Sequence, residues 1–208
     1  MKDSNGTGEG TTPLTSEEYL SRVTIGPRQP LNGTIHLTPY DPQWKSEFER
    51  HAQRLRVALG ANVLLLEHVG STSVPGLAAK PVIDILLAVA DSSDEKSYVP
   101  QLEEEGFVLR IREPEWFEHR LLKSPGDSVN LHVFSIGCEE IGRMLAFRDW
   151  LRTNDHDRRL YERTKRTLAA QSWKHTQDYA NAKSTVVQEI LARAVKPEGQ
   201  DRQSPGVP

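Results

Sequence analysis

The residue types best suited to chemistry are concentrated between positions 67 and 84 of the 208-residue sequence. A run of Val and Leu ends there in a Gly-Ser pair, and a loop rich in hydroxyl groups follows it. Because glycine has no side chain, the backbone can approach a ligand closely, and loop amides and hydroxyls can face an anion such as phosphate. We therefore predict an anion-binding loop, with the candidate ligand-binding residues Gly70, Ser71, Thr72, Ser73 and the cation Lys80.

Asp84 is a lone carboxylate within an otherwise apolar run at positions 82–89. An ionised carboxylate in such surroundings needs a cation, a metal ion or several hydrogen bonds. Mg²⁺ prefers hard oxygen ligands and keeps waters and substrate phosphates, so it would suit a carboxylate beside a phosphate-binding loop. The alternative is that Asp84 accepts hydrogen bonds from the preceding loop and only fixes its shape.

Glu67 and His132 are the candidates for completing a metal site with Asp84, because both lie in strand-like segments that could neighbour it. His132 could bind the metal or transfer a proton, and a histidine held by ordinary hydrogen bonds is the alternative. Glu67 and His68 are adjacent in a strand, so their side chains point to opposite faces, and we prefer Glu67 as the site residue. The predicted catalytic residues are Asp84, His132 and Lys80. Of these, Lys80 would neutralise the negative charge that develops during the reaction.

Three further basic residues are candidates for binding phosphate, namely Arg120, Arg148 and Lys183. Arg120 shares a strand face with Glu118, so a salt bridge is also possible, and a solvated strand face is the further alternative. Lys183 lies four residues after Tyr179 on one helix face, where core packing with a solvated stem is equally plausible. Between positions 143 and 174, nine Lys and Arg stand against four Asp and Glu. This excess could bind triphosphate or nucleic acid, or it could be an ordinary solvated helix surface.

Hydrophobic spacing predicts the elements that must position these residues. Asp41-Pro42 is a typical helix start, and apolar residues three and four apart continue the helix to Leu59, just before Gly60. Two buried strands are predicted at 63–69 and 82–89. The loop between them has room for one helical turn. The other predictions are a short strand at 35–37, a helix at 93–105, strands at 107–111, 118–123 and 128–134, and helices from 139 to 195 with breaks near 153–155 and 172–176. This order favours an α/β (α+β) fold, a mixed β-sheet backed by helices with a helical C-terminal third.

Composition predicts one folded domain at 35–195 between two polar segments. Residues 1–34 are expected to form a largely disordered extension, with a short helix from Thr15, and residues 196–208 a disordered tail. The single cysteine, Cys138, excludes an internal disulfide and a metal site built from several thiolates of one chain. No signal peptide or membrane-length apolar run is apparent, so we expect a cytoplasmic protein without a membrane partner.

The segment at 67–84 resembles the signature of the GrpB family, whose members are similar in fold to the nucleotidyltransferase superfamily. In that superfamily a Gly-Ser pair at a strand end is followed, after a loop, by a strand that carries metal-binding carboxylates. The resemblance extends from about position 35 through the C-terminal helices. It includes Asn130-Leu131-His132-Val133, Phe147-Arg148-Asp149-Trp150-Leu151, and the pattern Tyr161, Lys165, Tyr179 and Lys183.

The resemblance implies a protein that binds a nucleoside triphosphate with Mg²⁺ and transfers a nucleotidyl group to a small acceptor. The chain departs from active transferases at Leu86, because they usually carry a second carboxylate two residues after the first. A second hypothesis is therefore a catalytically degenerate nucleotide- or phosphate-binding module with a regulatory or chaperone-like role, since similar domains are found fused to dephospho-coenzyme A kinase. Nucleic-acid binding by the basic helices is the third and least favoured hypothesis, because no stacking aromatic array accompanies them.

The connection between the two buried strands is short, so its residues should lie over the end of the sheet, close to Asp84. We predict that Ser71, Lys80, Asp84 and His132 converge on one concave pocket. Because the neighbours of Leu86 are apolar, we predict that Leu86 is buried and does not line this pocket.

Overall fold

A mixed five-stranded sheet forms the centre of the computed structural model, which describes residues 15–28 and 31–194. The strand order is β1-β2-β5-β4-β3. β2 and β5 run parallel, whereas the other neighbouring pairs are antiparallel. The strands are β1 (Leu65–Val69), β2 (Ile83–Val89), β3 (Val108–Glu113), β4 (His119–Lys123) and β5 (Val129–Ser135). The predicted α+β class with a mixed sheet is confirmed.

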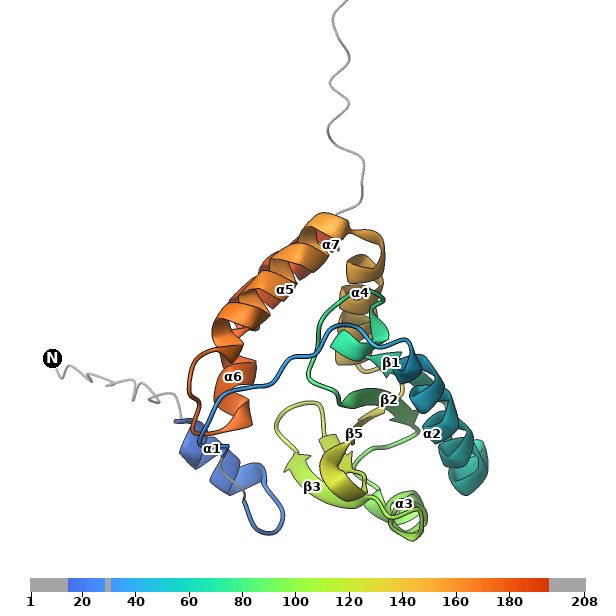
Figure 1. Ribbon diagram of the computed structural model, residues 1–208. Coiled ribbons are helices and arrows are strands. Elements are labelled where there is room, and N and C mark those ends of the chain that lie inside the picture. Colours follow the sequence, from blue (N-terminus) through green and yellow to red (C-terminus); the bar gives the residue numbers. More distant parts are fainter. Residues whose placement is uncertain (1–14, 29–30, 195–208) are drawn as a thin grey trace, which may run out of the picture.

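Helices cover both faces of this sheet (Figure 1). They are α1 (Ser16–Val23), α2 (Gln43–Leu59), α3 (Val99–Glu104), α4 (Glu139–Thr153), α5 (Asp155–Ala169), α6 (Thr176–Ala182) and α7 (Ser184–Ala194). α2 and α3 pack on one face of the sheet, where they bury the larger core. α4 packs on the other face, and α5 and α7 pack on α4 to form a second core. The C-terminal third is thus helical, as predicted.

The helix α2 begins where the sequence predicts. The Asp41 carboxylate accepts the backbone N–H of Gln43 at 2.9 Å, which satisfies one of the free amides of the first turn. Trp44, Ala52 and Leu55 lie on one stripe of this helix and are buried against the sheet. Gly60 adopts a φ of 53°, in the left-handed region that glycine tolerates, and the helix ends there.

Strand alternation divides β2 between the two cores. Ile85 and Leu87 face α2 and α3, whereas Leu86 and Ala88 face α4. Asp84 belongs by this alternation to the α4 face, at the beginning of the strand. Leu86 is fully buried among apolar side chains, which confirms its predicted burial.

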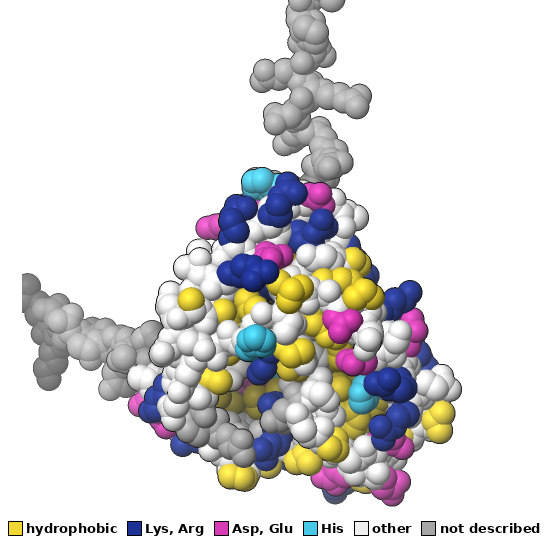
Figure 2. Space-filling model, viewed as in Figure 1, with side chains coloured by type: hydrophobic (Ala, Val, Ile, Leu, Met, Phe, Trp, Pro, Cys, Tyr) yellow, Lys and Arg dark blue, Asp and Glu magenta, His cyan; other side chains and the backbone are white. Residues whose placement is uncertain are grey.

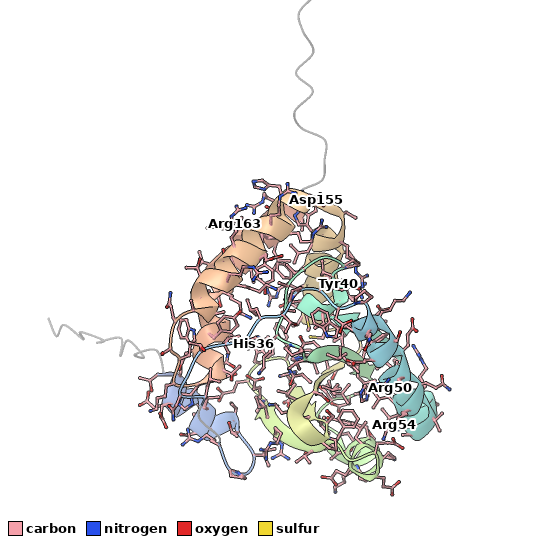
Figure 3. All side chains as sticks on the ribbon, in the orientation of Figure 1. His36, Tyr40, Arg50, Arg54, Asp155 and Arg163 are labelled. Carbon is pink, nitrogen blue, oxygen red and sulfur yellow. The ribbon has the colours of Figure 1, made fainter. Side chains whose placement is uncertain are left out.

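Two predicted elements differ from the structure. Residues 35–37 form no strand. The backbone of this segment is held by single contacts, such as the Ile35 N–H to Ala169 and an isolated bridge between Thr38 and Ala79. Figure 3 shows His36 and Tyr40 along this crossing segment between the helical half and α2. The predicted helix at 93–105 is shorter: a 3-10 turn at Glu95–Ser97 precedes α3, whose first turn contains Pro100. Proline is accepted there because it lacks the N–H that the helix interior needs.

The N-terminal helix α1 starts as predicted, because Thr15 and Glu18 form a reciprocal capping box. Beyond α1, the Ile25 N–H donates to the Arg110 carbonyl at 2.8 Å, so this segment is attached to β3. Of the segments predicted to be largely disordered, 1–34 and 196–208, residues 1–14, 29–30 and 196–208 lie outside the described residues, whereas 15–28 and 31–34 are described and include α1. Within 15–28 and 31–194, no helix is both long and apolar enough to cross a membrane.

Candidate functional site

A cleft of about 740 Å³ opens between the hairpin turn that joins β3 to β4 and the C-terminal helices. Trp116 and Phe117 of the turn form one side. Tyr161 of α5 and Lys183, at the junction of α6 and α7, line it from the helical half. The remaining lining residues are Glu139, Glu140, Arg143, Ala180, Ser184, Val187, Gln188 and Leu191.

Four polar side chains follow one another across the sheet face beside this cleft, and we call them the polar row: Glu113, His119, His132 and Asp84. Glu113 Oε2 lies 2.5 Å from His119 Nδ1, and His119 Nε2 lies 3.1 Å from His132 Nδ1. His132 Nε2 in turn lies 3.6 Å from Asp84 Oδ1. The predicted proximity of Asp84 and His132 is therefore observed.

The strand register produces this row. Leu121 on β4 pairs with His132 on β5, and Leu86 on β2 pairs with His132 on its other side, so these positions share one sheet face. Glu113 and His119 are paired across the hairpin of β3 and β4 and face the same way. Both are largely buried, whereas 22% of the His132 side chain and 27% of the Asp84 side chain remain exposed. The Asp84 end of the row can thus be reached by solvent or a ligand.

Asp84 is held ionised by its neighbours. Burial raises its pKa, but hydrogen bonding and charge from His132, a hydrogen bond from Asn130 and the charge of Lys183 outweigh this, so the pKa lies below the ordinary value. The Asn130 amide donates to Asp84 Oδ1 at 2.9 Å. Lys183 also lines the cleft, with its Nζ 4.5 Å from the centre of the Tyr179 ring. Lys183 is thus a neighbour of Asp84, and its binding to phosphate stays a prediction.

The Gly-Ser pair lies against Asp84, as the motif predicts. Gly70 has a φ of 68°, and a Cβ at this position would be 2.2 Å from Asp84 Oδ2. Only glycine permits this approach. Ser71 then begins a single 3-10 turn at Ser71–Ser73, which is the helical turn expected within the loop. Its Oγ accepts a hydrogen bond from Lys165 Nζ at 3.0 Å.

Thr72 and Ser73 support the loop instead of facing the cleft. The Thr72 hydroxyl donates to the Val82 carbonyl at 3.2 Å and lies 3.1 Å from His68 Nε2. The Ser73 hydroxyl donates to the Gly70 carbonyl at 2.6 Å. Both side chains are buried. Their hydroxyls are used within the loop, so their role in ligand binding stays a prediction.

Lys80 does not supply the cation of the site. It is exposed, it does not line the cleft, and it follows the bridge between Ala79 and Thr38. Lys165 and Lys183, from the helical half, stand beside the loop and Asp84 instead. Of the four residues predicted to converge, the structure therefore brings together Ser71, Asp84 and His132 but not Lys80.

Arg120 and Arg148 are structural ion-pair residues. Arg120 is buried on the α3 side of the sheet, where it bonds Glu95 at 2.5 Å and Glu118 at 3.2 Å, so the salt-bridge alternative holds. Arg148 donates to Glu67 Oε2 at 2.7 Å and to the His68 carbonyl at 3.0 Å. Their binding to phosphate stays a prediction, and both guanidinium groups lie outside the cleft.

Glu67 and His68 point to opposite faces of β1, as predicted. Glu67 pairs with Leu86 across β1 and β2, on the same face as Asp84. The His68 ring stacks on Phe48 of α2 with centroids 4.8 Å apart, and burial lowers its pKa to about 4. His68 is thus a neutral core histidine.

The site does not fit a magnesium ion. Among the described residues, no three His, Cys, Asp or Glu side chains gather in a way that could hold a metal. Glu67 is engaged by an arginine, and Asp84 is met by the Asn130 amide, the His132 ring and a lysine charge. Mg²⁺ takes oxygen ligands, from one or two carboxylates together with waters and phosphates, whereas most of the groups around Asp84 donate hydrogen bonds or carry positive charge. The predicted metal set of Asp84, Glu67 and His132 is therefore not assembled.

Lys165 was not selected from the sequence as a site residue, although it belongs to the quoted pattern. Its Nζ donates to the Ala78 carbonyl at 2.5 Å as well as to Ser71, and its side chain is buried beside the Tyr161 ring. Burial lowers its pKa to about 7, and the charge of Lys183 adds to this effect. The burial of Lys165 could not be predicted, because a lysine among polar neighbours in a helix looks the same in the sequence whether it is exposed or buried.

Glu113 and His119 were also missed. They flank a five-residue turn, and a hairpin with that connection places them directly opposite each other. This spacing was a usable signal. The strand predicted at 107–111 ends before Glu113, so the prediction did not pair that residue with His119.

The basic excess in the C-terminal helices is largely paired. Lys and Arg side chains gather over the upper end of the helical half (Figure 2), where Figure 3 labels Asp155 and Arg163 on α5. Arg158 pairs with Asp155, and Arg166 bonds Glu162 at 2.8 Å within the same helix. Such pairs favour the solvated-surface interpretation over a nucleic-acid surface.

Comparison with known proteins agrees with this architecture. The family model described as GrpB protein matches residues 34–193. A UPF0157 protein of Halalkalibacterium halodurans is 58% identical over 194 residues, which cover 93% of this chain and 97% of that protein. The solved structure of the conserved protein GrpB from Enterococcus faecalis is 32% identical with a TM-score of 0.63, covering 76% of this chain and 96% of the other.

A structure of Cid1 in complex with its short product ApU is more distantly similar. Its identity is 16% and its TM-score 0.44, covering 72% of this chain and 43% of Cid1. A similarity at this level concerns only the course of the backbone. The family match spans most of the chain and is supported by a close relative and by a solved structure of high coverage, so the chain belongs to the GrpB protein family.

Proposed function

We propose that this protein binds a nucleotide in the cleft, without a resident metal ion. The observation that carries the proposal is the composition of the cleft, in which exposed aromatic rings stand opposite a lysine that neighbours Asp84 and the Gly-Ser loop. Its volume of about 740 Å³ lies within the range of small-molecule sites. A nucleotide combines the two chemistries that such a cleft can recognise, an aromatic base and an anionic phosphate.

The aromatic side of the cleft suits a base. Trp116 and Phe117 are 39% and 40% exposed, although large aromatic side chains normally gain by burial. Stacking of a nucleobase on such a ring contributes about 1–3 kcal/mol. The hairpin turn would therefore bind the base.

The opposite side suits phosphate. Lys183 provides a positive charge within the cleft, and Lys165 donates to Ser71 beneath it. Charge-assisted hydrogen bonds from ammonium groups are stronger than neutral ones. Because Lys183 already balances Asp84, phosphate binding would not depend on Mg²⁺. This is the nucleotide- or phosphate-binding module of the second hypothesis, with its cations supplied by the helical half.

Isothermal titration calorimetry with ATP, GTP, CTP and UTP, each in EDTA and in MgCl₂, tests the proposal. We expect one nucleotide to bind in EDTA with an affinity similar to that in Mg²⁺. Trp116→Ala and Lys183→Met should each weaken binding about tenfold, since each removes about 1–3 kcal/mol. Lys45→Met, an exposed lysine on α2 across the sheet, is the matched control and should bind normally. Binding that requires Mg²⁺, or that ignores both cleft variants, would contradict the proposal.

A further inference from the structure

Glu140, in the first turn of α4, is a buried carboxylate that lines the cleft. Only 7% of its side chain is exposed. Arg143, one turn later, donates from Nε to Oε2 at 2.6 Å and from Nη2 to Oε1 at 2.9 Å. Arg143 also lines the cleft, and 47% of its side chain is exposed. The cleft therefore presents a carboxylate and a guanidinium side by side.

This pair keeps hydrogen-bonding capacity for a ligand. A carboxylate oxygen can accept at both of its lone pairs, and Arg143 uses only one on each Glu140 oxygen. A guanidinium likewise has further N–H groups besides those that Arg143 donates here. A ligand edge that carries two adjacent donors beside an acceptor would therefore match the pair.

The aromatic turn stands beside this pair. The Trp116 ring meets the Phe134 ring edge-on, with centroids 5.8 Å apart. Phe134 packs in one cluster with Ile141, the residue after Glu140. A base stacked on Trp116 would therefore lie next to the start of α4, where its edge can face the Glu140 carboxylate.

The protein itself fixes the shape of this turn. Phe117 and Glu118 adopt φ values of 55° and 49°, in the left-handed region that residues other than glycine rarely adopt. The Arg120 guanidinium donates to the Glu118 carbonyl at 2.9 Å, and the Trp116 ring packs edge-on against His119 with centroids 5.2 Å apart. Such strain persists where the surrounding structure determines it, and it is concentrated at ligand-binding sites. The aromatic platform is thus formed before a ligand arrives.

Charge sets the direction in which a nucleotide would lie in the cleft. Glu139 and Glu140 place carboxylates at the start of α4, where Glu140 balances the charge of Arg143. Lys183 places an ammonium group at the junction of α6 and α7. Because like charges repel and unlike charges attract, the phosphates would lie at Lys183. The hydrogen-bonding edge of the base would then face Glu140.

We propose that the base bound in the cleft is guanine, and that Glu140 and Arg143 determine this specificity. The inference rests on the proposed function of the cleft and names the nucleotide that it binds. Guanine presents two adjacent donors, its N1–H and its N2 amino group, which one carboxylate can accept together. Its O6 lies beside them and can accept from Arg143. Hydrogen bonds to charged groups of this kind are stronger than neutral ones.

The other bases do not match this arrangement. Adenine and cytosine each present one amino group beside an acceptor nitrogen, and uracil presents one N–H between two carbonyl oxygens. Each of them would direct an acceptor at a Glu140 oxygen, so that like partial charges repel and the buried carboxylate loses a partner. A site that is built to hydrogen-bond one ligand discriminates strongly against analogues that leave its buried polar groups unpaired.

Calorimetry of the wild-type protein in EDTA with GTP, ATP, CTP, UTP and ITP tests the specificity. We expect GTP to bind at least about tenfold more tightly than ATP, CTP or UTP. ITP differs from GTP only by the missing N2 amino group, and it should bind about tenfold more weakly than GTP. Equal affinities for GTP and ITP, or a preference for another base, would overturn the inference and leave nucleotide binding standing. Failure of all five nucleotides to bind would instead contradict the proposed function.

Glu140→Gln should change the specificity in a way that a loss of folding cannot imitate. A glutamine amide offers one acceptor and one donor, which match xanthine, where a carbonyl replaces the N2 amino group of guanine. We expect the variant to bind XTP more tightly than GTP, and the wild type to show the opposite order. Glu103→Gln, an exposed carboxylate on α3 across the sheet, is the control and should keep the wild-type order. A Glu140→Gln protein that still prefers GTP to XTP would show that Glu140 does not read the base.

Discussion

Gly70 is the residue on which the approach of the loop to Asp84 depends. In Gly70→Ala the new Cβ would lie 2.2 Å from Asp84 Oδ2, at a φ of 68° that alanine adopts only with strain. We expect the free energy of unfolding to fall by about 3 kcal/mol, from backbone strain and overpacking together. Urea unfolding measures this change.

Gly76→Ala is the matched control for that prediction. Gly76 lies in the same loop with a φ of 78°, but a Cβ there meets nothing within 4 Å. We expect it to cost only about 1 kcal/mol, which is the backbone strain alone. Equal losses in the two variants would show that glycine is required at position 70 by its φ and not by its contact with Asp84.

Lys165 makes the stability of the folded protein depend on pH. Burial lowers its pKa from 10.5 to about 7, so between these values the unfolded chain binds more protons than the folded one. Stability should therefore rise with pH across this window, by up to about 1.4 kcal/mol per pH unit. Urea unfolding of the wild-type protein and Lys165→Met at about pH 7.5 and pH 9 measures the difference. The variant should show a smaller rise, whereas Lys45→Met, with an exposed lysine, should match the wild type.

At the scale of elements, Asp157 joins three of the four C-terminal helices. Its carboxylate is buried on α5 and accepts hydrogen bonds from Trp150 of α4 at 2.7 Å and from Arg193 of α7 at 2.8 and 2.9 Å. Asp157→Ala would leave both donors without this partner, so we expect a loss of about 2–3 kcal/mol, the contribution of hydrogen bonds to a charged group. Asp155→Ala, on the exposed start of the same helix, should cost less than about 1 kcal/mol. Similar losses in Asp157→Ala and Asp155→Ala would mean that the hydrogen bonds of Asp157 to α4 and α7 add nothing to stability beyond an exposed ion pair.

The same carboxylate predicts a loss of stability in acid. The hydrogen bonds from Arg193, followed by those from Trp150 and His156, outweigh burial and lower the pKa of Asp157 to about 2. A lowered folded-state pKa contributes stability above the ordinary pKa near 3.8, and this contribution is lost as the pH falls toward 2. Thermal unfolding across this range should therefore show a steeper decline for the wild type than for Asp157→Asn.

The elements that the sequence predicted well are those whose signal is local. The helix α2 has a start signal at Asp41, a periodic apolar stripe and a glycine at its end. The apolar run that contains Asp84 was long enough to indicate a buried strand, and Gly70-Ser71 marked the loop before it. Residues 35–37 also alternate, but their apolar side chains pack against Ala169 and Tyr179, and no strand pairs with them.

The parts of the site that were missed depend on contacts distant in sequence. The polar row requires the pairing of β5 with β4 and a register shift in β3 near Leu109, and neither can be read from one segment. The choice of Lys80 over Lys165 followed from sequence proximity to the loop. In the fold, α5 brings Lys165 to Ser71 across a separation of 94 residues. Tertiary packing decides such neighbours, and hydrophobic periodicity carries no information about them.

At the scale of the whole molecule, Arg148 connects the helical half with the sheet. It extends from α4 to Glu67 and to the His68 carbonyl on β1, and it also bonds Asp149 at 2.7 Å. A planar guanidinium can make these contacts together, whereas an ammonium cannot. The two halves between which the cleft opens are therefore held in place partly through this residue (Figure 1).

Arg148→Lys tests whether this connection is structural. We expect the free energy of unfolding to fall by about 2 kcal/mol, because hydrogen bonds to charged groups contribute about 1.5–3 kcal/mol each and lysine retains part of them. Hydrogen-exchange mass spectrometry should show faster exchange in both β1 and α4. Arg143→Lys, whose partner Glu140 is on the same helix, should change stability by less than about 0.5 kcal/mol. If Arg148→Lys instead kept full stability but lost nucleotide binding, Arg148 would be the phosphate ligand that the family resemblance implied, and the cleft would extend to β1.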